Sequence, residues 1–347
     1  MQEIREIFIS EESFSSRISN SLRRRTDSWK VITEDEAEKL KAGYGRILIK
    51  SRKGDFVKRC PCTQSPYISC CYYNINLVEG CHQDCRYCIL PDYLSDKPLT
   101  IYSNMDLLLE ELNDFHASLN APIRIGTGEL GDSLLYEKTI GHNDLLIPLL
   151  NDFSNFILEL KTKTLETLSL KKYWKNNNIV WAWSVNTEYV SGKLEGKCAS
   201  TKDRIALAKE ISENGGKVAF HFDPVCPYKD ALRDYRDLVD LIFSQIKRER
   251  ISWISLGVLR FPGSQKVFSD SLIEFISNEY INGEDGKLRL LKTLRKRFLK
   301  SISERIYEFD ENAMLYLCME PYDVWEHVLA GKPEDIKNAI FHGGRIA

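Results

Sequence analysis

Three cysteines, Cys81, Cys85 and Cys88, lie within one eight-residue stretch in the order C-x3-C-x2-C. Thiolate sulfur is a soft ligand that proteins use to bind zinc, copper and iron–sulfur clusters. A structural zinc site takes four ligands, which here would require His82, His221 or a distant cysteine as the fourth. A [4Fe–4S] cluster is usually held by four cysteines, so three would leave one iron open for a substrate or cofactor. The spacing therefore favours a cluster, and zinc stays an alternative at this point.

The rest of the composition is that of an ordinary globular protein. The chain has 347 residues, of which 43% are hydrophobic and 28% charged, and its formal net charge of −2 gives no strong field for polyanions. No apolar run approaches the roughly 18 residues of a membrane span. The first residues lack a secretory signal pattern. We therefore expect a cytoplasmic protein without a membrane partner, in which the ten cysteines do not form structural disulfides.

The other cysteines fall into two groups. Four precede the C-x3-C-x2-C stretch, and an auxiliary cluster or zinc, redox-active thiols and buried thiols all stay open for them. We expect the three that stand alone in the second half of the chain to be buried free thiols. The first group is Cys60, Cys62, Cys70 and Cys71, and the second is Cys198, Cys226 and Cys318.

Short apolar segments alternate with amphipathic segments over most of the chain. This alternation predicts an α/β fold with a parallel sheet, as an incomplete barrel or a doubly wound sheet. We predict strands at 72–78, 122–128, 156–162, 178–186, 217–225 and 251–261, and helices at 104–119, 143–153, 165–176, 200–216 and 228–246. Our preferred architecture is a partial (β/α)6 TIM-type barrel at 60–262, with an N-terminal extension at 1–59 and a helical C-terminal region at 263–347.

Within the N-terminal extension, residues 33–43 predict a short helix that Thr33 caps and Gly43 ends, followed by a strand at 45–51. Within the C-terminal region, residues 287–305 predict a helix rich in Lys and Arg, which could track nucleic-acid phosphates or form a solvated face.

Polar side chains follow the predicted barrel strands where these strands end. Parallel strands bring their carboxyl ends to one rim, where barrel and doubly wound folds both place their chemistry. The three-cysteine stretch follows the first strand, so we expect it at the same rim. These strand-end residues are Glu129, Lys161, Ser184, Asn186, His221, Asp223 and Arg260.

The stretch CHQDCRYC resembles the C-x3-C-x-aromatic-C signature of radical SAM enzymes. Residues 44–329 further resemble the spore photoproduct lyase-like family, on segments such as IRIGTGELGDSL, LELKTKT, WAWSVNTEYV, AFHFDPV and LYLCMEPYDVW. The resemblance implies a [4Fe–4S] cluster on Cys81, Cys85 and Cys88, with S-adenosyl-L-methionine at the open iron. It implies reductive cleavage of that cofactor to a 5′-deoxyadenosyl radical, which abstracts hydrogen from a substrate. A one-electron reductant of the flavodoxin or ferredoxin type would then be a partner.

The resemblance also implies residue roles. Tyr87 would lie by the adenine of the cofactor, Glu129 would receive the methionyl ammonium, and Lys161 and Ser184 would contact the cofactor, with Asn186 as a further contact. An ammonium and a hydroxyl suit a carboxylate. His221 and Asp223 would bind substrate or transfer a proton, or serve as structural hydrogen-bonding groups. We expect Arg204 to form a surface or rim ion pair.

Two positions depart from true spore photoproduct lyases, which repair a thymine photoproduct in DNA. Glu129 stands where those enzymes have the cysteine that returns a hydrogen, and Ile89 stands where they have a tyrosine. Cys198 or Cys226 would have to substitute. A DNA lesion is therefore the substrate predicted by family analogy, and radical chemistry on a non-DNA substrate is the alternative. A zinc-stabilised nucleic-acid-binding protein is a more remote alternative.

Overall fold

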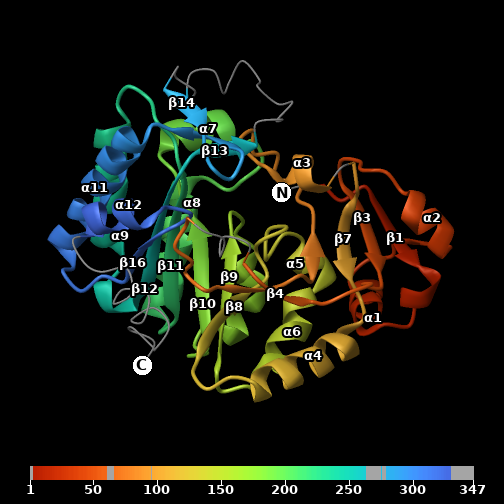
Figure 1. The fold of residues 1–347 in the computed structure, drawn as a ribbon. Helices are drawn as coiled ribbons and strands as arrows, with labels where there is room; N and C mark the ends of the chain where they lie inside the picture. Colours follow the sequence, from red (N-terminus) through yellow and green to blue (C-terminus); the bar gives the residue numbers. More distant parts are fainter. Residues whose placement is uncertain (1–2, 61–65, 95, 263–274, 276–278, 330–347) are drawn as a thin grey trace.

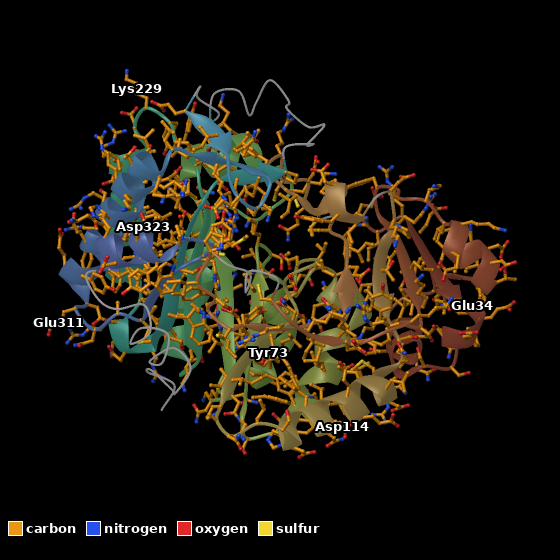
Figure 2. All side chains as sticks on the ribbon, viewed as in Figure 1. Glu34, Tyr73, Asp114, Lys229, Glu311 and Asp323 are labelled. Atoms are coloured by element: carbon orange, nitrogen blue, oxygen red, sulfur yellow. The ribbon has the colours of Figure 1, made fainter. Side chains whose placement is uncertain are left out.

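The structure is a computed structural model that describes residues 3–60, 66–94, 96–262, 275 and 279–329 (Figure 1). The sequence predictions for Cys62 and for the C-terminal end of the chain lie outside these residues. Within them, no helix combines the length and the apolar character needed to cross a bilayer. Figure 2 shows charged side chains such as Asp114, Lys229 and Glu311 on the exterior of the molecule, where they are exposed.

The larger of two parallel sheets forms the centre of the molecule. Its strands are β4 (Val57–Arg59), β5 (Tyr73–Ile75), β8 (Ile123–Gly126), β9 (Phe156–Thr162), β10 (Ile179–Ser184), β11 (Lys217–Val225), β12 (Ile251–Val258) and β16 (Leu315–Leu317). They pair in the order β16-β12-β11-β10-β9-β8-β5-β4, and all neighbours are parallel except β4, which is antiparallel to β5.

This sheet is curled into a half-barrel (Figure 1). The guanidinium of Arg124 on β8 lies 4.7 Å from the ring of Tyr316 on β16, although these strands are far apart in the pairing order. The indole of Trp253 on β12 likewise donates to Glu159 on β9 at 2.7 Å. Such contacts across the concave face require a closed curvature, so this face is a packed interior.

All six predicted strands are present in the large sheet. A seventh parallel strand, β16, was missed, because only three residues, Leu315–Leu317, are extended there. The predicted helix at 165–176 is a 3-10 helix, η3 (Glu166–Tyr173), that is interrupted at Leu170. The predicted basic helix at 287–305 was also wrong at its start, since residues 287–290 form a strand.

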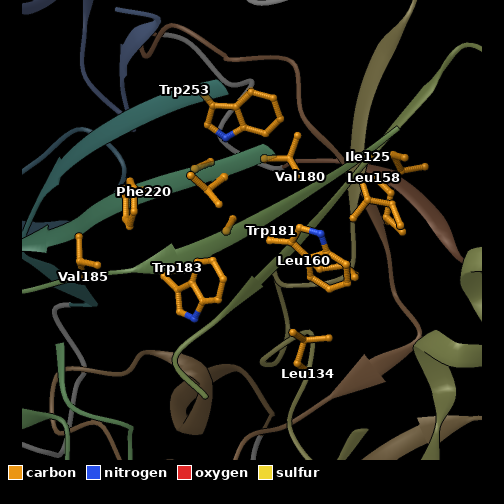
Figure 3. Close-up of a cluster of buried hydrophobic side chains, with 14 of the residues drawn as sticks. Ile125, Leu134, Leu158, Leu160, Val180, Trp181, Trp183, Val185, Phe220 and Trp253 are labelled. Atoms are coloured by element: carbon orange, nitrogen blue, oxygen red, sulfur yellow. The ribbon is translucent and has the colours of Figure 1, made fainter. Parts of the chain in front are cut away.

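Alternation along the strands decides which side chains enter the half-barrel. On β10, Trp181 and Trp183 are completely buried on the convex side, within the apolar cluster of Figure 3. Ala182 and Ser184 therefore point to the concave side, because successive strand residues face opposite ways. The indole of Trp183 still donates to the carbonyl of Thr164 at 3.2 Å, so its one polar group is satisfied.

The second parallel sheet contains most of the predicted N-terminal extension. Its strands are β1 (Glu6–Ser10), β2 (Lys30–Ile32), β3 (Arg46–Lys50), β6 (Val78–Glu79) and β7 (Leu99–Tyr102), in the order β2-β1-β3-β7-β6. All neighbours are parallel except β6, which is antiparallel to β7. The chain thus leaves the large sheet after β5, contributes β6 and β7 to the second sheet, and returns at β8. The second sheet therefore contains strands from both sides of the predicted boundary at residue 59.

Helices cover the two sheets, and a small antiparallel sheet lies at one end. The helices are α1 (Arg17–Arg23), α2 (Glu34–Lys39), α3 (Leu90–Leu94), α4 (Met105–Ala117), α5 (Glu137–Ile140), α6 (His142–Leu150), α7 (Glu188–Leu194), α8 (Thr201–Glu213), α9 (Ala231–Gln245), α11 (Lys292–Phe309) and α12 (Tyr322–Leu329), with 3-10 turns η1 (Glu11–Ser13) and η4 (Arg248–Arg250). The small sheet has the order β13 (Arg260–Pro262), β15 (Lys287–Leu290), β14 (Tyr280–Asn282). The predicted C-terminal region is therefore not purely helical.

Caps define the predicted helix starts. The Thr33 hydroxyl accepts from the Glu36 amide at 3.3 Å, and the Glu36 carboxylate accepts from the Thr33 amide at 2.9 Å. This reciprocal capping box satisfies amides that the first helical turn leaves unpaired. The helix that Thr33 begins ends at Lys39, four residues before the predicted stop at Gly43.

Candidate active site

The cysteine loop, residues 81–88, connects β6 with the start of α3 at the carboxyl end of the large sheet. The amide of Gly80 donates to the carbonyl of Leu130 beyond β8, at 2.8 Å. The amide of Arg86 donates to the carbonyl of Leu194 at the end of α7, also at 2.8 Å. The loop is therefore tied to segments that follow β8 and β10, which confirms that it lies at the rim of the half-barrel.

The three thiols of the loop are half-buried. Burial raises the pKa of Cys81 well above its usual value and raises that of Cys88 to about 11, whereas a hydrogen bond from Cys198 lowers the pKa of Cys85. Within the described residues, no three His, Cys, Asp or Glu side chains gather closely enough to hold one metal ion. A cluster distributes its thiolates over several irons, so an all-thiol set in one loop suits a cluster better than a single ion.

A fourth thiol lies against the loop. The sulfur of Cys198 is 3.4 Å from the sulfur of Cys85, and it donates to the side-chain oxygen of Gln83 at 2.8 Å. The amide nitrogen of Gln83 donates to Asp132 at 2.6 Å. Cys226, the other proposed substitute for the returning cysteine, is completely buried in an apolar cluster that includes Tyr87.

Tyr87 belongs to a buried ionic network behind the loop. Its hydroxyl donates to Glu195, and Glu195 forms an ion pair with Arg204. Arg204 was predicted to form a surface or rim ion pair. The surface alternative is wrong, because the side chain is completely buried, and the pair lies at the rim, where Arg204 also donates to the carbonyl of Ser184 at 2.6 Å. The charges of Lys163 and Arg204 hold the pKa of Glu195 below its usual value in spite of its burial. The network fixes the middle of the cysteine loop on α7 and α8.

Lys163 completes this network, and the sequence analysis missed it. Its ammonium lies 3.9 Å from Glu195 and 5.8 Å from the centre of the Tyr87 ring. Burial lowers the pKa of Lys163, but the negative charges of Glu195 and Cys85 outweigh burial and leave it raised, so the amine stays charged. The signal was present in LELKTKT, because Lys163 follows the last residue of β9 and is two residues after Lys161, the spacing that places side chains on one face of an extended chain.

Glu129 and Lys161 lie together at the same rim. Glu129 is half-buried, and burial raises its pKa while the positive charge of Lys161 offsets part of the rise. The segment that contains Glu129 can approach the end of β9 closely because residue 128 is a glycine. A Cβ at Gly128 would lie 3.2 Å from the carbonyl oxygen of Lys161 and 2.9 Å from the hydroxyl of Ser133. A carboxyl group and an ammonium that interact electrostatically are thus available at this rim for a zwitterionic ligand.

The two predicted residues that follow β10 differ in their surroundings. Ser184 is almost buried at the end of the strand, in register with His221. The Asn186 amide nitrogen donates to the carbonyl of Pro224 at 2.9 Å, and its oxygen accepts from the Tyr235 hydroxyl at 2.5 Å. Both ends of the Asn186 amide therefore serve the fold.

His221 lies inside the half-barrel, in a polar layer below the rim. Its Nε2 donates to Glu159 at 2.7 Å, since a carboxylate can only accept, and its Nδ1 accepts from the Ser255 hydroxyl at 2.6 Å. Burial lowers the pKa of His221 and favours this neutral ring, although Glu159 opposes the shift. The hydrogen bonds match the structural alternative for His221, and its catalytic role stays a prediction.

Arg124 carries the positive charge of this layer. Its guanidinium lies between the rings of Tyr72, Trp253 and Tyr316, at 4.9, 5.0 and 4.7 Å from their centres. It also donates to the sulfur of Cys70 at 3.2 Å. Cation–π contacts of this kind stabilise a cation that has lost its water. The sequence analysis did not recognise Arg124 or Glu159 as members of an interior layer.

Asp223 lies between the interior layer and the solvent. Burial raises its pKa, but the charges of Arg260 and Lys161 more than compensate, and Arg260 donates to it at 3.2 Å. Arg260 also donates to the sulfur of Cys318 at 3.6 Å. A Cβ at Gly257 would be 2.8 Å from Asp223 and 3.1 Å from Cys318, so this glycine lets the two side chains converge.

Cys60, Cys70 and Cys71, the described cysteines upstream of the loop, do not gather into one metal-binding group. Cys70 and Cys60 interact electrostatically with Cys318 inside the half-barrel mouth. Cys71 instead points back to the carbonyl of Ser69, at 3.8 Å. The nine described cysteines are free thiols. Of the three expected to be buried, Cys226 is buried, whereas Cys198 and Cys318 are only half-buried.

The basic helix α11 is largely neutralised by acidic side chains. Lys292 and Lys296 pair with Asp323 at 3.3 and 3.0 Å. Arg295 pairs with the buried Glu320 at 3.0 Å. These pairs favour the solvated or structural interpretation of the helix over a phosphate-binding one.

Comparison with known proteins gives a consistent family. A family model described as spore photoproduct lyase matches residues 63–315. The spore photoproduct lyases of Clostridium acetobutylicum and of a Geobacillus species are 25% and 24% identical over 210 and 220 residues, or 59% and 60% of this chain. Each match spans 60% of the relative's own length.

Solved structures give the same fold. A spore photoproduct lyase complexed with dinucleoside spore photoproduct superimposes with a TM-score of 0.79 at 17% identity, over 91% of this chain and 99% of that one. A double mutant with bound AdoMet and dinucleoside spore photoproduct gives 0.77 over 91% and 98%, also at 17% identity. The half-barrel is thus the fold that this chain shares with these lyases.

Proposed function

Because the chain belongs to the spore photoproduct lyase family, we propose that it is a radical SAM enzyme with a [4Fe–4S] cluster and S-adenosyl-L-methionine. When bound, the cluster supplies the electron that cleaves the cofactor to methionine and a 5′-deoxyadenosyl radical, which abstracts hydrogen from the substrate. A flavodoxin- or ferredoxin-type protein is the proposed reductant. The observation that carries the proposal is the position of Cys81, Cys85 and Cys88 in one loop tied to the rim of the half-barrel.

The surrounding residues suit a zwitterionic cofactor. We assign the methionyl ammonium to Glu129, whose carboxylate is half-buried. Lys161, Lys163 and Ser184 supply the positive charge and the hydroxyl that a methionyl carboxylate needs. Tyr87 presents its ring at the loop while Glu195 holds its hydroxyl. Asn186 stays a weaker proposal because its amide already serves the fold.

Anaerobic reconstitution with iron and sulfide tests this proposal. We expect a brown protein that forms 5′-deoxyadenosine from the cofactor with dithionite, and we expect Cys81→Ala to lose both the cluster and the product. Cys71→Ala is the matched control, because it removes a buried thiol outside the loop whose sulfur lies against the carbonyl of Ser69. Stoichiometric zinc without cofactor cleavage would refute the proposal and support the zinc-stabilised alternative.

For the substrate we propose a DNA photoproduct lesion, the class present in the solved lyase complexes. His221 and Asp223 are the proposed residues for substrate binding or proton transfer, from the interior layer and the rim. Incubation with a dinucleoside spore photoproduct, followed by chromatography for thymine products, is the direct test. Cofactor cleavage without recovery of thymine would reject repair of this lesion.

A non-DNA substrate is the second candidate. It is favoured by Glu129 and Ile89 at the positions of the expected cysteine and tyrosine, and by the acid-paired cations of α11. Under this candidate, lesion-containing DNA neither binds with the salt dependence of phosphate contacts nor increases hydrogen abstraction. Binding of labelled duplex at two salt concentrations separates the two candidates.

A further inference from the structure

We propose that Cys198 is a positioning residue that donates a hydrogen bond to the sulfur of Cys85 and thereby raises the reduction potential of the cluster. The inference rests on the proposed function, since it requires that Cys85 binds iron. It gives Cys198 a role at the cluster itself.

The contact between the two sulfurs is fixed by the backbone. The Cys85 and Cys198 sulfurs are 3.4 Å apart, within hydrogen-bonding distance for sulfur. The amide of Lys197 donates to the carbonyl of Gln83 at 2.9 Å, and Cys85 itself forms a β-bridge with Glu195. Backbone contacts thus hold the segment 195–198 alongside the cysteine loop, so the sulfur contact does not depend on side-chain rotation alone.

The orientation of Gln83 decides which groups can share the Cys198 proton. Its amide nitrogen donates to Asp132 at 2.6 Å, so its oxygen must face Cys198, at 2.8 Å. Asp132 is held in turn by the hydroxyl of Thr162 at 2.7 Å and the amide of Lys163 at 2.8 Å. Gln83 therefore only accepts at this position and cannot supply a proton to either sulfur.

Binding of iron would change the hydrogen-bonding capacity of the Cys85 sulfur, the second possible acceptor for the Cys198 proton. A Cys85 that ligates iron has lost its proton and can only accept, and its negative charge makes it a stronger acceptor than the neutral Gln83 oxygen. The proton of Cys198 then lies between these two acceptors and is drawn to the Cys85 sulfur. The geometry requires no movement of the backbone for this exchange.

The effect on the cluster follows from charge. Hydrogen bonds to ligand sulfurs set the reduction potential of iron–sulfur clusters, together with net charge and exposure. Reduction adds negative charge to the cluster and its sulfurs, so a donor stabilises the reduced state more than the oxidised state. Glu195 offsets one of the two positive charges of Lys163 and Arg204, and the thiol of Cys198 is the group that contacts the ligand sulfur directly.

Redox titration of the reconstituted protein, followed by electron paramagnetic resonance, tests the inference. We expect Cys198→Ala to shift the midpoint potential to a lower value, and Cys198→Ser, which keeps a donor, to stay close to the wild type. Cys71→Ala removes a buried thiol outside the loop, next to the carbonyl of Ser69, and should leave the potential unchanged. An unchanged potential in the alanine variant, or a serine variant shifted as far as alanine, would overturn the role of the hydrogen bond.

If Cys198→Ala fails to assemble the cluster, a comparison of Cys198→Val with Cys198→Ser tests the same hydrogen bond. Cys198→Val fills the space of the sulfur without a donor, so comparison of Val with Ser isolates the hydrogen bond, and equal potentials in these two would also reject it. The proposed function fails separately: a wild-type protein that assembles no [4Fe–4S] cluster refutes the function, whereas a clustered protein with an insensitive potential refutes only the role of Cys198.

Discussion

The two parallel sheets of this molecule bury very different side chains. In the N-terminal sheet, Ile9 and Ile49 face each other in register and are fully buried, as is Ile101 on the next strand. In the half-barrel, the corresponding interior contains Glu159 and Arg124. Parallel strands alone therefore do not dictate an apolar core. Of the two larger sheets, as far as the structure describes them, the half-barrel is the one whose strands bury charged side chains, and its strand ends carry the candidate site.

Buried charge is a poor source of stability. Removing an ion from water costs several kcal/mol in real proteins, and a buried pair often contributes no more than well-packed apolar groups of the same volume. Stability therefore does not explain the buried charge in the half-barrel. The network behind the cysteine loop indicates that the buried charge holds the candidate site in place. The following predictions test whether charge is needed in the half-barrel and not in the N-terminal sheet.

The largest effect is expected at Glu195. Glu195→Ala leaves Arg204 and Lys163 buried without their carboxylate, and breaking a buried pair costs about 3–5 kcal/mol. We expect this loss in the free energy of unfolding by urea, together with loss of bound iron after reconstitution. Glu195→Gln keeps the size and one acceptor and should lose less of both. An alanine variant that unfolds at the wild-type urea concentration would contradict the network.

An apolar substitution should have a similar but smaller effect in the N-terminal sheet. Ile49→Ala opens a cavity between Ile9 and Ile101, and such core truncations cost about 2–5 kcal/mol. Ile49→Val removes a single methylene and should cost about 1 kcal/mol. Urea unfolding measures both. We expect the loss to be the same at pH 6 and pH 8, since no titratable group is changed.

The half-barrel should respond to pH where the N-terminal sheet does not. Burial lowers the folded-state pKa of His221 from the ordinary value of 6.5, so the unfolded chain binds a proton that the folded protein refuses. Stability is therefore complete above pH 6.5 and falls as the pH decreases below it. His221→Gln should flatten this dependence in urea titrations between pH 7.5 and 5.5. An equally steep dependence in the variant would show that His221 is not its source.

The smallest effect is expected at the helix cap beside the N-terminal sheet. Thr33→Ala removes the hydroxyl that accepts from Glu36, and the loss of such a cap costs about 1 kcal/mol. Thermal unfolding should show a small decrease in Tm, while Thr33→Ser should retain the wild-type value. Iron content and cofactor cleavage should be the same in both variants, because the cap lies outside the candidate site.

Local sequence patterns predicted six strands of the half-barrel and the rim at which they end. The residues that were missed are those that only long-range contacts bring together. The short cysteine loop and the polar residues after each strand are visible in the sequence. Glu159 stood in an otherwise apolar strand, but its partners Trp253 and His221 lie 94 and 62 residues away, and no local pattern joins them. Lys161 on β9 and Lys163 just after it have the spacing of one strand face, so only the contact with Glu195 shows which of them lies behind the cysteine loop.

The path of the chain between the sheets has a consequence for shortened forms of the protein. The family match begins at residue 63, which suggests that the first strands are dispensable. Yet β7, just after the cysteine loop, pairs with β3 on one side and β6 on the other. A chain without residues 1–59 would expose one edge of β7, and open strand edges recruit other chains. We therefore expect such a protein to self-associate through the strand that follows its cysteine loop.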